Sequence, residues 1–187
     1  DGWDRSKISS ATTQEPYKVL FYGDSIFSGY GLGDPQGSVV NVIKETFSKD
    51  NYVDRGVIYA DLSHEGETTS NAVTRIKQAI AMKPDVIILA LGTNDARNGT
   101  DPDIIYNNLD TILKDLARSG IYTLFVGMQA NTANGYDYLS KFNSVYPKLA
   151  ETYSVVFLPF LKEGVAGNRM LNQRDAIHPN ADGAKVI

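Results

Sequence analysis

Two hydrophobic patterns alternate along the chain. Short runs rich in β-branched and aromatic residues predict strands at residues 18–22, 56–61, 86–91, 122–128 and 155–159. Between them, apolar residues recur three and four positions apart, which predicts amphipathic helices. These positions are Val39, Val42, Ile43 and Phe47; Val73, Ile76 and Ile80; Ile105, Leu109, Ile112, Leu113 and Leu116; and Leu139, Phe142, Tyr146 and Leu149. A last helical pattern begins after Asn180 and stops at Ile187, so we expect a final helix that is cut short.

The alternation of strand and helix predicts the fold class. The run at residues 86–91 is hydrophobic at every position, as is typical of a strand covered on both faces of a parallel sheet. We therefore expect an α/β protein: a three-layer α/β/α sandwich around a flavodoxin-like, doubly wound sheet of five parallel strands. No linker or charge block divides the pattern, so residues 17–187 are predicted to form a single domain after a polar N-terminal tail at residues 1–16.

Composition excludes several classes of protein. The 18 Lys and Arg residues are outnumbered by 22 Asp and Glu, and no two basic residues are adjacent, so nucleic acid is a poor partner. The longest apolar run, residues 86–91, is far shorter than the roughly 18 residues of a membrane-spanning helix, so we expect no stable membrane association. The lack of cysteine excludes disulfides, thiolate metal sites and cysteine nucleophiles.

Polar residues follow each predicted strand. Ligands of doubly wound sheets bind outside the carboxyl ends of the strands, so these junctions are the places to look for chemistry. They carry Gly23-Asp24-Ser25; Ser63-His64-Glu65-Gly66; Gly92-Thr93-Asn94-Asp95; Gln129 and Asn131; and a long loop at residues 160–179 that contains Asp175 and His178. A serine nucleophile needs a base, a group that orients the base, and donors for the oxyanion, and all these residue types are present.

Each junction residue also has a structural interpretation when it is taken alone. Ser25 suits a helix N-cap, and Asn94 and Asp95 suit a turn in which they bind the local backbone. His178 could pack against the sheet edge, and Asp175 could cap a short helical turn. Taken one at a time, these motifs do not decide between a structural and a catalytic role.

Other motifs give no support to nucleotide, metal or ordinary hydrolase sites. Gly29, Gly31 and Gly33 match neither the dinucleotide-binding pattern nor the P-loop pattern. His64 has no second ligand at metal spacing, so we interpret it as a loop residue near the site. No serine lies in a G-x-S-x-G elbow, which excludes the ordinary α/β-hydrolase.

Taken together, the junction motifs resemble a known family. Gly23-Asp24-Ser25-Ile26, Gly66, Gly92-Thr93-Asn94-Asp95 and Asp175-x-x-His178-Pro179 are similar, in order and spacing, to the four blocks of the SGNH (GDSL) hydrolases. Further similarity lies in Gly29-Tyr30-Gly31-Leu32, Gly66-Glu67-Thr68-Thr69, Pro84-Asp85, Gly127-Met128-Gln129 and His178-Pro179-Asn180. This pattern resembles the bacterial arylesterase, acyl-thioesterase and lysophospholipase type, from about residue 18 to the end of the chain.

The resemblance implies a role for each residue of the site. It makes Ser25 the nucleophile, His178 the general base and Asp175 the carboxylate that orients the imidazole. It assigns the oxyanion hole to the backbone N–H groups of Ser25 and Gly66 and to the side-chain amide of Asn94. It implies no metal and no organic cofactor, and its substrates would be small aryl or acyl esters or thioesters.

The sequence departs from the family pattern at two positions and leaves several questions open. Ile26 stands where the family name has Leu, and Thr93 stands where close relatives often have Gly, so we expect Thr93 to narrow the site beside Asn94. The loops at residues 97–102 and 131–137 are expected to set the acyl length, with Tyr136 and Tyr138 either lining an acyl groove or serving surface and packing roles.

Three further expectations concern function and location. The same fold and triad would also serve a carbohydrate O-acetylesterase or an acyltransferase. A flavodoxin-like binding module that has lost activity is the alternative outside the enzymes. The chain begins at Asp1 without Met and its relatives are often exported, so we expect a periplasmic or secreted protein, with the cytoplasm as the alternative.

Overall fold

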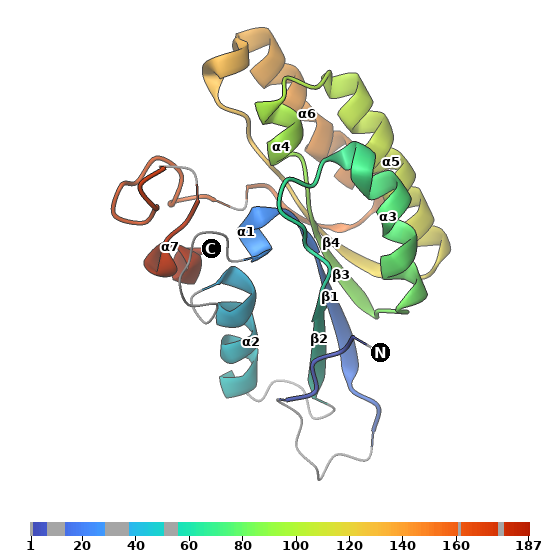
Figure 1. The fold of residues 1–187 in the computed structure, drawn as a ribbon. Helices are drawn as coiled ribbons and strands as arrows, with labels where there is room; N and C mark the ends of the chain where they lie inside the picture. Colours follow the sequence, from blue (N-terminus) through green and yellow to red (C-terminus); the bar gives the residue numbers. More distant parts are fainter. Residues whose placement is uncertain (1, 7–13, 29–37, 51–55, 161, 176–177) are drawn as a thin grey trace.

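The core of the molecule is a sheet of five parallel strands, seen in a computed structural model that describes residues 2–6, 14–28, 38–50, 56–160, 162–175 and 178–187. The strands are β1 (Tyr17–Gly23), β2 (Val57–Asp61), β3 (Val86–Ala90), β4 (Tyr122–Val126) and β5 (Val156–Leu158). Their order is β2-β1-β3-β4-β5 (Figure 1). This is the flavodoxin-like order, with the chain reversing its direction of travel at β1 and β3. The predicted fold class is confirmed.

Helices cover both faces of this sheet and complete the three layers (Figure 1). One face carries α3 (Thr69–Ala81), α5 (Pro102–Arg118) and α6 (Tyr136–Tyr153), packed side by side. The other face carries α1 (Ser25–Ser28), α2 (Val39–Asp50) and α7 (Ala181–Val186). The short helix α4 (Thr93–Arg97) and the 3-10 turn η2 (Thr132–Asn134) lie in the connections that follow β3 and β4.

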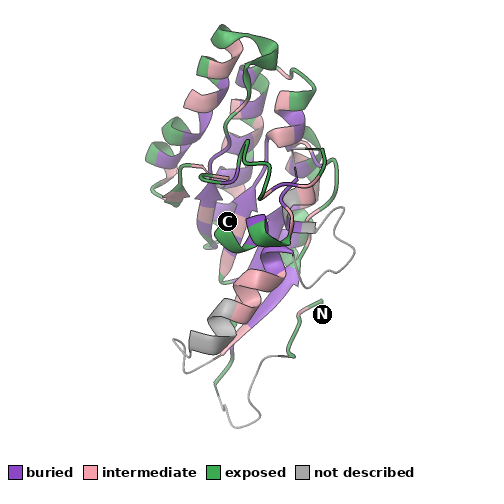
Figure 2. Cartoon of the chain, turned by 90° about the vertical axis from the view of Figure 1, so that its left-hand side faces the viewer, coloured by how far each residue is buried: buried purple, intermediate pink, exposed green. Residues whose placement is uncertain are grey.

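The predicted hydrophobic stripe of α5 and the apolar run of β3 face the core. In α5 every apolar position of the pattern, from Ile105 to Leu116, is buried, and in β3 Ile87 and Leu89 are fully buried. Buried residues therefore fill the sheet and the inner helix faces, whereas the outer helix faces are exposed (Figure 2). Burial of these side chains is the main stabilising term of the fold.

The N-terminal segment touches the sheet, and one predicted motif lies outside the described part. Asp4 forms an antiparallel bridge with Tyr59 of β2, and Trp3 packs against the core. The glycines at positions 29, 31 and 33 lie outside the described residues. In the described part of the chain, no helix is both long and apolar enough to cross a membrane.

Candidate active site

Ser25, His178 and Asp175 form a continuous hydrogen-bonded chain. Ser25 opens α1 directly after β1, and its Oγ lies 2.9 Å from Nε2 of His178. On the other side of the imidazole, Nδ1 lies 2.6 Å from Oδ2 of Asp175. Because an ionised carboxylate only accepts, Nδ1 carries the proton and Nε2 is left to accept from the serine hydroxyl. This is the arrangement of a serine nucleophile with its base.

The histidine is also held through its backbone. The N–H of His178 donates to Oδ1 of Asp175 at 3.0 Å, so both carboxylate oxygens bind the same residue. The imidazole is nearly buried, with 10% of the His178 side chain exposed, whereas 38% of the Asp175 side chain is exposed. An imidazole fixed on three atoms and shielded on most sides keeps one orientation toward Ser25.

Side-chain amides brace the long loop that carries this pair. Nδ2 of Asn172 donates to the carbonyls of Val165 at 2.7 Å and Asn168 at 2.8 Å. Gln173 bonds across the turn, its N–H to the carbonyl of His178 at 2.8 Å and its Nε2 to the carbonyl of Pro179 at 3.0 Å. The loop is therefore a braced structure that places the histidine. These amides are not predictable from the sequence, because nothing in the apolar spacing distinguishes them from ordinary loop residues.

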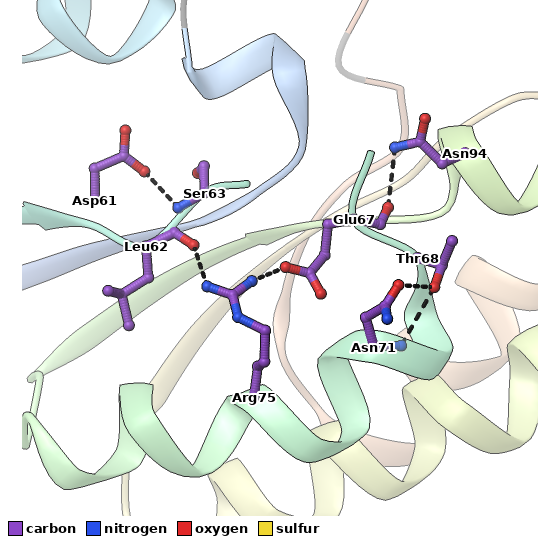
Figure 3. Close-up of polar contacts among 8 residues, drawn as sticks. All are labelled: Asp61, Leu62, Ser63, Glu67, Thr68, Asn71, Arg75 and Asn94. Carbon is purple, nitrogen blue, oxygen red and sulfur yellow. Dashed lines mark hydrogen bonds and ion pairs between the residues drawn. The ribbon is translucent and has the colours of Figure 1, made fainter. Parts of the chain in front are cut away.

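The second predicted group, Gly66 and Asn94, is brought together by the structure. Nδ2 of Asn94 donates at 2.9 Å to the carbonyl of Glu67, and the Asn94 residue is 8% exposed (Figure 3). Gly66 has a φ of +76°, which glycine adopts without the strain that other residues would incur. Among the described residues, its N–H has no hydrogen-bond partner. This segment is attached to the strand that precedes Ser25, because the N–H of His64 donates to the carbonyl of Gly23 at 3.1 Å.

A buried ion pair fixes the same segment. Glu67 is 2% exposed, and its carboxylate pairs with the guanidinium of Arg75 in α3 (Figure 3). Arg75 also donates to the carbonyl of Leu62 at 3.2 Å and lies 5.6 Å from the centre of the Tyr22 ring. A carboxylate buried this deeply is costly unless it is paired. The pair therefore ties both ends of the loop from Leu62 to Glu67 to one helix. No local sequence pattern indicates this ion pair.

Asp95 links the asparagine to the same helix. Its Oδ1 accepts from Oγ1 of Thr69 at 2.6 Å and its Oδ2 accepts from the N–H of Thr69 at 3.0 Å, and the residue is 1% exposed. The side chains of Asn94 and Asp95 therefore bind residues 67–69. This is a tertiary contact, so the alternative in which these two side chains bind only the backbone of their own turn does not describe them. Just before them, Gly92 has a φ of +125°, and a Cβ there would clash with Oη of Tyr146.

The structure also bears on the predictions for Thr93 and for the two tyrosines, Tyr136 and Tyr138. Thr93 lines a pocket beside Asn94, and its Oγ1 contacts Sδ of Met128 at 3.7 Å. Tyr138 donates to the carbonyl of Thr100 at 2.7 Å and stacks on Phe142, while Tyr136 is 79% exposed, so packing and surface roles describe the two tyrosines. Within the described ranges, no group of three or more His, Asp and Glu side chains could hold a metal ion.

Comparison with known proteins identifies the family. The model of the GDSL-like lipase/acylhydrolase family matches residues 21–186, which include all five predicted site residues. The chain belongs to this family. The predicted resemblance is therefore confirmed.

Three known proteins are similar to this chain over most of their length. Esterase TesA of Pseudomonas aeruginosa is 31% identical over 86% of this chain and 79% of its own. An arylesterase of Vibrio mimicus is 29% identical over 95% of this chain and 88% of its own. The solved structure of AlinE4, described as an SGNH-hydrolase family esterase, superposes with a TM-score of 0.79 at 34% identity, covering 94% of this chain and 92% of that chain.

Proposed function

We propose that this protein is a serine esterase that hydrolyses the carboxylic ester or thioester bonds of small aryl or acyl substrates through an acyl-enzyme on Ser25. One observation carries the proposal: Oγ of Ser25, the imidazole of His178 and the carboxylate of Asp175 lie in one hydrogen-bonded chain, with links of 2.9 and 2.6 Å. Membership of the GDSL-like family and the similarity to proteins named as esterases support the same conclusion.

The first half of the reaction acylates Ser25. His178 accepts the hydroxyl proton at Nε2 as Oγ attacks the acyl carbonyl carbon, and the negative charge of Asp175 stabilises the imidazolium that forms. The electron pair of the carbonyl π bond moves onto the oxygen, which gives a tetrahedral intermediate with an oxyanion. When the C=O bond re-forms, the bond to the leaving alcohol or thiol breaks. His178 returns its proton to that leaving group. Water repeats the sequence on the acyl-enzyme and restores the serine.

The oxyanion in this scheme is held by three donors. They are the N–H groups of Ser25 and Gly66 and the amide of Asn94. The open N–H of Gly66 and the fixed position of the segment around it support this assignment. One N–H of the Asn94 amide donates to the carbonyl of Glu67, so the second N–H is the one that would donate to the oxyanion.

An inactive flavodoxin-like binding module accounts for the site less well. Such a module needs no serine at hydrogen-bond distance from a histidine that a carboxylate orients. The described geometry around Ser25 and His178 is the feature that catalysis requires and binding does not.

Covalent labelling tests the proposal directly. A p-nitrophenyl alkylphosphonate is expected to label one site per chain, because Oγ of Ser25 displaces nitrophenolate from phosphorus while His178 takes the proton. Peptide mass spectrometry should find the phosphonyl group on the peptide that contains Ser25, and heat-denatured protein should stay unlabelled. Labelling on another serine, or ester hydrolysis that continues in fully labelled protein, would contradict the assignment.

The pH dependence follows from the proposed base. Only the neutral imidazole of His178 can accept the serine proton, so kcat/KM for ester hydrolysis is expected to fall as the pH is lowered. Initial rates on a neutral ester between about pH 4.5 and 9 measure this profile. A flat profile down to about pH 5 would argue against His178 as the base.

The predicted periplasmic or secreted location stays a prediction. Fractionation of the producing cells with an antibody to this chain would test it.

A further inference from the structure

A pocket of about 580 Å³ lies beside the triad, at the carboxyl ends of β3, β4 and β5. It borders the site in two places. Thr93 precedes Asn94 in the chain, and Lys162 lies close enough to the carboxylates of Asp24 and Asp175 to feel both charges. A pocket of this size beside a nucleophile is where part of the substrate binds.

The lining of this pocket has few large apolar side chains. Its apolar side chains are four alanines and Phe160, and no Leu, Ile, Val or Met stands among the described residues that line it. Gln129, Asn131 and Asn134 contribute amides. Burial of a long alkyl chain gains free energy only against apolar surface, so this pocket does not suit one.

The pocket is also cationic. Arg97 and Lys162 both line it, and the described lining contains no Asp or Glu, although the protein as a whole carries a net charge of −4. Overall composition therefore does not explain the positive wall.

Arg97 differs from the other cation of the pocket in its surroundings. Across the described ranges, the guanidinium of Arg97 makes no ion pair or hydrogen bond. Burial lowers the pKa of the Lys162 ammonium, and the charge of Arg97 lowers it further. Asp24 and Asp175 act in the opposite direction, so Lys162 is partly balanced from the triad side. Two like charges that face one cavity repel each other, and an anion between them would relieve that repulsion.

The amides are partly committed to holding the wall in place. Nδ2 of Asn134 donates to the carbonyl of Ala96 at 2.7 Å, and Oδ1 of Asn131 accepts from the N–H of Ala133 at 2.9 Å. The first bond fastens the turn after β4 to α4, which carries Arg97, and the second closes the turn itself. The helix that carries Arg97 is therefore held in place by a hydrogen bond from the neighbouring turn.

We propose that this pocket binds an anionic group of the ester substrate, with Arg97 as its main contact and Lys162 as the second. The inference rests on the proposed hydrolysis at Ser25 and adds a substrate class to it: short esters that carry a carboxylate or phosphate. An anion on the acyl side and one on the alcohol side present the same chemistry to Arg97, so the experiment has one arm for each.

Each arm compares two esters of similar shape that differ in charge. The acyl arm uses phenyl hydrogen succinate and phenyl 4-methylpentanoate, and the alcohol arm uses 4-carboxyphenyl acetate and 4-isopropylphenyl acetate. The measured quantity is the ratio of kcat/KM for the charged ester to that for the neutral ester, in wild type and in Arg97→Gln. Arg118→Gln is the matched control, because Arg118 is an exposed arginine at the far end of α5.

In at least one arm, Arg97→Gln is expected to lower this ratio about tenfold, since it removes a charge-assisted hydrogen bond. Arg118→Gln should leave the ratio within about twofold of wild type, and added salt should lower the wild-type ratio more than that of Arg97→Gln. Equal ratios in wild type and Arg97→Gln in both arms would overturn the proposal.

A binding measurement separates this inference from the proposed function. Calorimetric titration with succinate and with inorganic phosphate needs no turnover, and Arg97→Gln should bind both about tenfold more weakly than wild type. Unchanged affinity overturns the anion site. Hydrolysis that depends on Ser25 but shows no charge preference would remove the anion site alone, whereas hydrolysis that ignores Ser25 would remove the proposed function.

Discussion

Replacing Ser25 with alanine is expected to lower kcat for ester hydrolysis by about 10⁴- to 10⁶-fold. The change removes the atom that forms the acyl-enzyme, and no described hydroxyl other than that of Ser25 is bonded to His178. What remains is attack by water, helped by the oxyanion donors alone. Initial rates on p-nitrophenyl acetate through palmitate, with an acyl thioester alongside, measure the loss and give the preferred chain length.

Ser63→Ala provides the control for this experiment. Ser63 lies at the same edge of the sheet, in the loop after β2, and its N–H donates to Asp61 (Figure 3). Because its hydroxyl takes no part in the proposed reaction, the variant should retain activity within about threefold of wild type. A Ser25→Ala enzyme with more than about 1% of wild-type activity and an unchanged Tm would remove this serine from the mechanism.

The fold was predictable because its signals are local. All five strands come from short runs rich in β-branched and aromatic residues, and the buried face of α5 comes from spacing that any window of that helix contains. The exact ends of the strands were less predictable. The strand expected at residues 122–128 ends at Val126, and the N–H of Gly127 then bonds to the carbonyl of Leu158, a tertiary contact that no local pattern contains.

The candidate site also has parts that could be predicted from the sequence and parts that could not. Ser25, His178 and Asp175 carry recognisable motifs, and topology alone places strand ends at one edge, so their meeting could be expected. The pair of Glu67 with Arg75 and the bonds from Asp95 to Thr69 join segments by long-range packing. Such contacts depend on how a helix sits on the sheet, and single-sequence patterns do not encode that placement.

The cationic pocket is another part of the site that local sequence patterns do not predict. Arg97 and Lys162 are far apart in the sequence and come together only because the turns after β3 and β5 meet at the same edge. The loops at residues 97–102 and 131–137 were expected to set the acyl length, and Arg97, Asn131 and Asn134 do line the pocket. The two cations of the lining change the kind of substrate that those loops are expected to select.

Replacing Asn94 with alanine is expected to lower kcat by about 10²- to 10³-fold and to change KM little. The amide would bind the oxygen of the acyl group most strongly when that oxygen carries charge, so its loss raises the barrier and leaves ground-state binding nearly intact. Steady-state kinetics on a neutral ester separate the two constants. An Asn94→Ala enzyme within about threefold of wild type would contradict the oxyanion assignment.

Asn94 has a second role that this experiment must separate from catalysis. Its amide also holds the carbonyl of Glu67, so the variant could displace the Gly66 segment as well as remove a donor. Asn108→Ala is a matched control, because Nδ2 of Asn108 donates at 3.1 Å to Oγ1 of Thr69, at the start of the same helix that anchors the segment. If loosening of this region caused the loss, Asn108→Ala would lower kcat by a similar factor. If the loss comes from the missing oxyanion donor, Asn108→Ala should keep kcat within about threefold while its Tm falls as far as that of Asn94→Ala.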